Sequence, residues 1–152
     1  MKVALNLLLI AMVAACGQPS SGPSPAQATP TPEKFGTATL SETACSFEMP
    51  DNLPLRAVSI SLVNKSKYTG HFSLVHIHDG HTFKDVVDYW NSPLGPVQHP
   101  SFITEIRQVD VPADGTREAV ATVMQKGSYA LSCVYADETN QVTGFFHELK
   151  TA

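Results

Sequence analysis

A two-residue alternation of apolar and polar side chains, repeated along most of the chain, limits the fold more than any other feature. Val58, Ile60 and Leu62 alternate with serines, and the segment 128–135 alternates in the same way. Such alternation is typical of strands with one buried face. The pattern predicts strands over residues 43–49, 56–63, 71–78, 103–111, 117–124, 128–135 and 142–150. Seven to eight short strands separated by turn sequences predict an all-β sandwich.

One segment follows helical spacing instead. Its apolar residues fall at i, i+3, i+4 and i+7, which places them on one helix face: Phe83, Val86, Val87 and Trp90. Thr82 suits the N-cap position, and Asp85 suits the exposed amides and the positive dipole end of the first turn. We therefore expect a short helix over residues 82–91, inserted in a connection of the sandwich.

The N-terminus resembles the signal of an exported lipoprotein. Lys2 precedes an apolar run, and small residues then lead to Cys16. The run is too short for a permanent membrane span. We predict a signal peptide over residues 1–15 and a lipid on the thiol of Cys16, which would anchor the mature chain to a bacterial membrane, facing the periplasm or the exterior.

Composition divides the mature chain into a tether and one domain. Residues 16–36 are rich in proline, serine and threonine without apolar periodicity, which is typical of an extended spacer. Residues 37–152 are long enough for one hydrophobic core. Without residues 1–15 the chain keeps nine Lys and Arg against fourteen Asp and Glu, a balance that argues against nucleic acid as a partner. Partners are therefore expected to be the membrane, through the lipid, and a protein of the envelope.

Three motifs of the domain resemble the cupredoxins, the plastocyanin and azurin superfamily. They are the segments Asp79–Phe83, Gly127–Cys133 and Gly144–Leu149. The resemblance implies a Greek-key β-sandwich and a type 1 copper site made of two histidines, a cysteine thiolate and a weak axial methionine. Cys133 stands where the thiolate would be, but Gly70 and Phe145 occupy the places of the first histidine and the methionine. Residues 134–143 contain no second histidine, so the ligands of type 1 copper are largely missing.

The cysteine count gives Cys133 another role. If Cys16 carries lipid, Cys45 and Cys133 remain, and an even pair in an exported protein predicts a disulfide. Both lie on apolar faces of their predicted strands. Closing a loop of this length should stabilise the fold by about 4 kcal/mol. The alternative is two buried free thiols.

The histidines supply a second chemical signal. Four of them crowd into eleven residues: His71, His76, His78 and His81. His76 and His78 project from the same face of a strand, and His81 follows the next turn. Imidazoles in this arrangement can hold Cu(II), Zn or Ni. The alternative is that they are polar side chains on a solvated face.

Catalysis is not expected, because the sequence contains no Gly-x-Ser-x-Gly, His-Glu-x-x-His or phosphate-loop motif. Three functions remain. The first is a non-catalytic envelope lipoprotein that acts as a binding or structural module. The second is a metal-binding or delivery protein that uses His76, His78 and His81, with copper as the candidate cofactor and His71 and Cys133 as further ligands. The third is a blue-copper electron-transfer protein with atypical ligands around Cys133.

Overall fold

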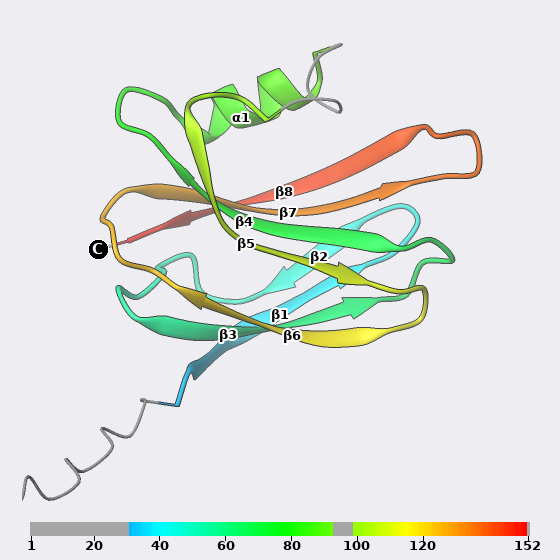
Figure 1. The fold of residues 1–152 in the computed structure, drawn as a ribbon, viewed down its shortest axis with the longest axis horizontal. Coiled ribbons are helices and arrows are strands. Elements are labelled where there is room, and N and C mark those ends of the chain that lie inside the picture. The colour runs from blue at the N-terminus through cyan, green and yellow to red at the C-terminus, as the bar shows by residue number, and fades with distance from the viewer. Residues whose placement is uncertain (1–30, 93–98, 152) are drawn as a thin grey trace, which may run out of the picture.

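The computed structural model describes residues 31–92 and 99–151 (Figure 1). Along the chain, the elements are β1 (Glu33–Leu40), β2 (Cys45–Glu48), β3 (Ala57–Asn64), β4 (Gly70–Ile77), α1 (Phe83–Trp90), β5 (Ile103–Val111), β6 (Thr116–Thr122), β7 (Ser128–Ala136) and β8 (Val142–Lys150). The strands form two sheets, which we call sheet A (order β2-β1-β3-β6) and sheet B (order β5-β4-β7-β8). The predicted all-β sandwich with one short helix is confirmed.

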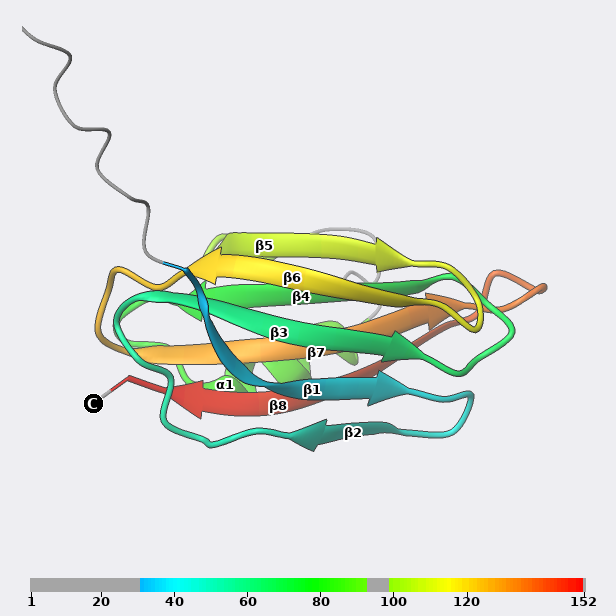
Figure 2. The same ribbon diagram turned by 90° about the horizontal axis from the view of Figure 1, so that it is seen from below.

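The strands are connected as a Greek key. β4 and β5 form an antiparallel pair, β5 contacts β6 where the two sheets meet, and β7 returns to pair with β4. The resulting spatial order β7-β4-β5-β6 is that of a Greek key. Figure 2 shows β5 and β6 side by side at one edge of the sandwich. Apart from the parallel pairing of β1 with β3, all paired strands are antiparallel.

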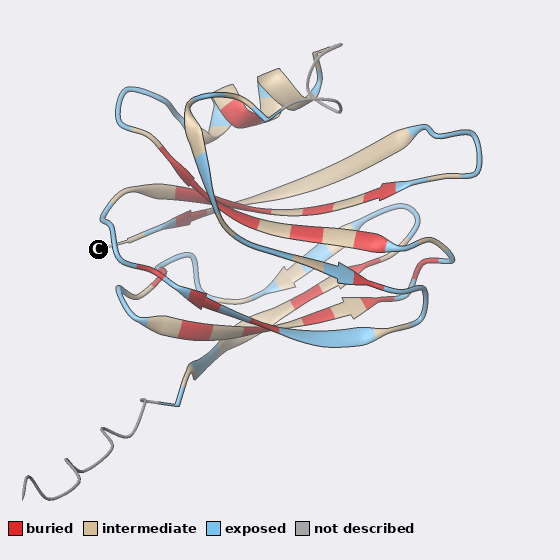
Figure 3. Ribbon diagram, in the orientation of Figure 1, coloured by how far each residue is buried: buried red, intermediate tan, exposed pale blue. Residues whose placement is uncertain are grey.

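The main hydrophobic core fills the space between the sheets. On β3, Val58, Ile60 and Leu62 are buried while the serines between them are half-buried, as the alternation predicted. Figure 3 shows the buried segments recurring along the strands of both sheets. A second, smaller cluster lies on the other face of sheet B: Val75, Ile77, Ala130 and, from α1, Val86. Sheet B is therefore covered on both faces.

A disulfide joins the two sheets. Cys45 on β2 of sheet A is bonded to Cys133 on β7 of sheet B, with 6.3 Å between their Cα atoms. The two residues are 88 positions apart in the chain. The pair expected from the cysteine count therefore forms between the two sheets. A loop of this length favours the folded state by about 4 kcal/mol in the chain-entropy description.

β1 extends further toward the N-terminus than the sequence indicated. The expected tether ended at residue 36, whereas β1 begins at Glu33 and includes a bulge between Lys34 and Gly36. The strand lies between β2 and β3 and pairs with both. Residues 33–36, whose own sequence resembles a spacer, are held by backbone pairing with β3, and β2 pairs only with Thr37–Leu40.

The expected signal peptide, Cys16 and the tether up to residue 30 lie outside the described residues. Within the described part of the chain, no helix combines the length and apolar character that a membrane crossing requires.

Candidate functional site

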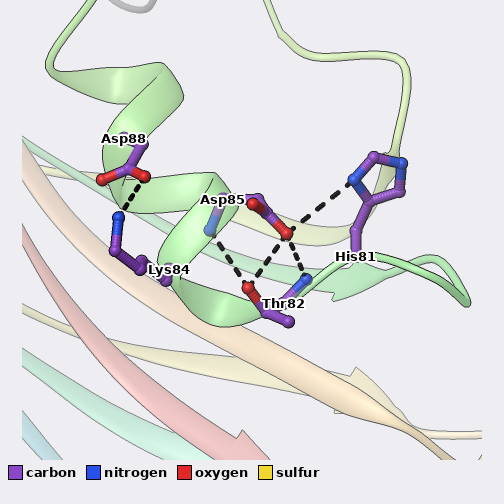
Figure 4. Close-up of polar contacts among 5 residues, drawn as sticks. All are labelled: His81, Thr82, Lys84, Asp85 and Asp88. Atoms are coloured by element: carbon purple, nitrogen blue, oxygen red, sulfur yellow. Dashed lines mark hydrogen bonds and ion pairs between the residues drawn. The ribbon is translucent and has the colours of Figure 1, made fainter.

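The helix α1 begins where the sequence predicted. Thr82 is the N-cap, its hydroxyl accepts a hydrogen bond from the backbone N–H of Asp85, and the Asp85 carboxylate accepts from the backbone N–H of Thr82 at 2.7 Å. Figure 4 shows this reciprocal capping box, with His81 beside it, its Nδ1 3.9 Å from Asp85 Oδ2. The Thr82 backbone N–H, followed by its hydroxyl, holds the pKa of Asp85 below its ordinary value. The start of α1 is thus fixed by its own sequence.

α1 lies on the face of sheet B that points away from sheet A (Figure 1). Val86 is buried against the sheet and packs with Val75 and Ala130. Beyond this contact, helix and sheet line a half-open cavity of about 130 Å³. Small apolar cavities with a few convergent polar groups are the usual form of ligand sites in proteins. This cavity is the candidate functional site.

The wall of the cavity at the C-terminal end of α1 is aromatic. The Trp90 indole crosses the backbone of β8 at Gly144, where an added Cβ would lie 2.6 Å from Trp90 Nε1. The ring of Trp90 also meets that of Phe146 edge-on, with 5.4 Å between the centroids. Only glycine at position 144 leaves room for the indole in this position. The close approach holds the end of the helix against sheet B.

The floor of the cavity comes from the outward-facing residues of the central strands. On β4 these are His71, Ser73 and Val75, and on β7 they include Ala130 and Ser132. The Ser132 hydroxyl donates to the backbone carbonyl of Ser73 at 3.3 Å. Strand periodicity alone missed this site, because it identified one buried face per strand. The available signal was the small or apolar character of the second face together with an amphipathic helix nearby.

The surroundings of Cys133 do not fit a type 1 copper ion. Cys133 is fully buried, bonded to Cys45, and flanked across the strands by Phe72 and Phe145, which offer no nitrogen or sulfur ligand. The position expected for the first histidine, Gly70, has no space for a side chain, because a Cβ there would lie 2.7 Å from Leu40 Cδ2. A sulfur held in a disulfide is not available as a thiolate.

His71, next to Gly70, lies on the opposite face of β4. Its Nδ1 is 2.8 Å from Asp110 Oδ1 on β5, and the side chain lines the cavity beneath α1. This placement follows from the alternation of a strand, since a shift of one residue moves a side chain to the other face. His71 and Cys133 are therefore on different faces of sheet B.

The structure brings His76 and His78 together, with 6.2 Å between their ring centroids. His76 is only 8% exposed, its ring lies 4.8 Å from that of Tyr129, and its buried Nε2 has no hydrogen-bond partner. Gly127 leaves room for this nitrogen, since a Cβ at position 127 would lie 2.9 Å from Nε2. His78 Nε2 is 2.8 Å from the hydroxyl of Thr104.

His81 has other neighbours. Its ring stacks on Phe102 with 4.3 Å between centroids, and its nearest carboxylate is Asp85. In residues 31–92 and 99–151, no three or more His, Cys, Asp or Glu side chains lie close enough together to hold a metal ion. Of the predicted ligands, the structure therefore pairs only His76 with His78.

No family profile matches the sequence. No curated protein matches it either. Among solved structures, the chain is similar to sodium dithionite-reduced auracyanin from the photosynthetic bacterium Roseiflexus castenholzii. The TM-score is 0.49 at 13% sequence identity, and the match covers 80% of this chain and 98% of that one.

Two further structures are similar. Auracyanin B matches with a TM-score of 0.47 at 14% identity, over 82% of this chain and 92% of that one. A multicopper oxidase matches with a TM-score of 0.42 at 12% identity, over 82% of this chain and 45% of that one. At these identities the likeness is one of fold alone.

Proposed function

We propose that this chain is a lipid-anchored module of the bacterial cell envelope that binds a small ligand without transforming it. The cavity between α1 and sheet B carries this proposal. It is lined mainly by apolar side chains, with a few polar groups at one side. The lipoprotein signal ending at Cys16 and the proline-rich segment after it support an anchored location.

The hydrogen bonds of the cavity support binding without catalysis. A serine nucleophile needs a base within hydrogen-bond reach of its hydroxyl. Ser132 instead donates to a backbone carbonyl, and the imidazole of His71 is paired with Asp110. In the described part of the chain, no hydrogen bond joins a serine hydroxyl to a histidine ring.

A cavity-filling variant tests the binding function. The full chain with Cys16→Ser, which carries no lipid, is screened against small aromatic and aliphatic compounds by the fluorescence of Trp90. Ser132→Leu places a larger side chain in the cavity and should abolish binding, whereas Ser61→Leu makes the same change on the outer face of sheet A and should not. Equal binding to both variants, or no binding to the parent chain, would contradict the proposal.

Anchoring has its own test. The unmodified chain should sediment with membranes and incorporate a labelled fatty acid, and Cys16→Ser should abolish both properties. A chain that sediments equally well with serine at position 16 would show that the lipid is not its anchor.

A second candidate function is metal binding at His76 and His78. The observation that favours it is the buried Nε2 of His76, which lacks a partner although buried polar atoms nearly always have one. Titration with Cu(II) and Zn should then give one equivalent of bound metal, lost in His76→Ala/His78→Ala. Binding should be retained in His99→Ala, which removes a histidine that lines the cavity beneath α1. Binding that is unaffected by the double substitution would exclude this site.

The same titration bears on blue copper. A strong visible band on adding Cu(II) after reduction of the disulfide would favour an electron-transfer site at Cys133. We expect no such band, because the residues beside Cys133 are Phe72 and Phe145.

A further inference from the structure

A row of polar side chains crosses the floor of the cavity beneath α1. Gln108 on β5, Ser73 on β4 and Ser132 on β7 are paired in register, so the three lie side by side across sheet B. All three line the cavity. Hydroxyl and amide groups can both donate and accept hydrogen bonds. The floor therefore offers both kinds of partner to a ligand atom above it.

The row next to these residues is apolar. Val75 and Ala130 are paired in register, and α1 covers them with Val86. Trp90 lies on the other side of the polar row, against Gly144 and Phe146 of β8, and Tyr89 also lines the cavity. The polar row thus lies between the Val75–Ala130 row and Trp90, so an aromatic ring can pack between these apolar groups above a hydrogen-bonding floor.

The volume sets the size of the ligand. Protein cavities of about 150 Å³ accept a single benzene ring, and this cavity measures about 130 Å³. A single ring with one small substituent fits the available space.

The charges around the cavity favour a neutral ligand. No lysine or arginine is among the described residues that line it, and the two imidazoles that do are those of His71 and His99. The carboxylate of Asp110 lies beside the polar row and already pairs with His71. A carboxylate on the ligand would lose its hydration without gaining the permanent charge of a lysine or arginine as a partner.

We propose that the ligand is a monocyclic aromatic compound that carries one neutral hydroxyl, that is, a compound of the phenol class. Its ring lies between Trp90 and the Val75–Ala130 row, and its hydroxyl bonds to Ser73 and Ser132. This inference rests on the proposed function, and it adds the chemical class of the ligand.

Three probes of similar size test the class: phenol, toluene and benzoate. Each is titrated into the full chain with Cys16→Ser, and binding is followed by Trp90, the only tryptophan in the chain. Phenol should bind at least about fivefold more tightly than toluene, the ratio that one net hydrogen bond supplies. Benzoate should bind more weakly than phenol.

Removing the hydroxyls should remove the preference. In Ser73→Ala/Ser132→Ala, toluene affinity should stay within about twofold while phenol falls to the level of toluene. Ser61→Ala, on the outer face of sheet A, should change neither affinity. The thermal unfolding of each variant shows whether the fold is retained, and a Trp90 signal with toluene shows that the cavity remains open.

The results distinguish failure of the proposed ligand class from failure of the proposed small-ligand function. Toluene or benzoate binding as tightly as phenol would overturn the ligand class while a small-ligand function survives. An unchanged preference for phenol in the double variant would also overturn it. If none of the three compounds binds but others in the wider screen do, the class alone fails; if nothing binds, both proposals fail.

Discussion

Cys133 and Ser132 are neighbours in β7, yet they belong to two environments that differ in nearly every physical respect. Cys133 faces the interior, where it is fully buried and crosslinked to the opposite sheet. Ser132 faces α1 and lines a cavity with polar groups on its floor. The inner face of sheet B is packed with core side chains and crosslinked to sheet A by the disulfide, whereas the outer face has room for a ligand. The cavity therefore lies outside the main core, between the inserted helix and the outer face of sheet B.

The largest expected effect comes from removing the crosslink. Cys45→Ala/Cys133→Ala should lower the free energy of unfolding by about 4 kcal/mol, because the unfolded chain regains the freedom of a long loop. Denaturant unfolding measures this loss, and wild type under reducing conditions should show a comparable one. Ligand binding at the outer face should remain within twofold. A simultaneous loss of binding would mean that the two faces are coupled.

Truncation of adjacent residues compares the two faces directly. Leu131 is buried in the main core. Leu131→Ala should lower the free energy of unfolding by about 3 kcal/mol, because it removes buried apolar surface and leaves a cavity. Ser132→Ala should cost less than about 1 kcal/mol, since it removes one hydrogen bond beside an existing cavity. Equal losses measured by denaturant unfolding would show that both faces are packed alike.

The capping box offers a way to destabilise α1 without destabilising the two sheets. Thr82→Ala removes the hydroxyl that receives the Asp85 N–H and should destabilise α1 by about 1 kcal/mol. Amide exchange should accelerate in α1 while β3 and β7 stay protected. Thr43→Ala, in the exposed β1–β2 turn, provides a control without effect on the helix. Faster exchange throughout the core would contradict a helix that opens separately.

The smallest effect is an acid response confined to α1. The pKa of Asp85 is lowered mainly by its hydrogen bond from the Thr82 backbone. A lowered carboxyl pKa contributes stability that is present above the ordinary value and is lost as pH falls through the folded value. The protection factors of the α1 amides, which are corrected for the intrinsic pH dependence of exchange, should therefore fall below about pH 4. Asp85→Asn should remove this dependence, and a variant that still follows the wild-type acid curve would contradict the assignment.

Much of the sandwich could be predicted from side-chain alternation, because one face of each strand is buried and the other is not. The segments 103–111 and 142–150 have the predicted bounds. The helix was also predictable, since its cap and its apolar face are both local signals. The strand β1 was not, because its first residues pair only with β3, which is distant in the sequence.

The disulfide and the cavity also differ in how far the sequence could predict them. The disulfide could be expected from the number of cysteines and the parity of their strands. The cavity could not, because it depends on which strands are neighbours: Ser73 meets Gln108 and Ser132 only through the strand order of sheet B. The pairing of His76 with His78 was a local property, but the placement of His81 against Phe102 required the β4–α1 connection.

The position of β1 has a mechanical consequence. If the chain is tethered at its N-terminus, any tension enters the domain at Glu33 and acts along the axis of β1. The hydrogen bonds of β1 to β3, and those of Thr37–Leu40 to β2, would then be loaded in shear instead of opening one after another. Since β2 is bonded through Cys45 to sheet B, part of that force would pass into the second sheet by a covalent route. The domain would thus resist pulling from the membrane side better than a sandwich anchored through an edge strand.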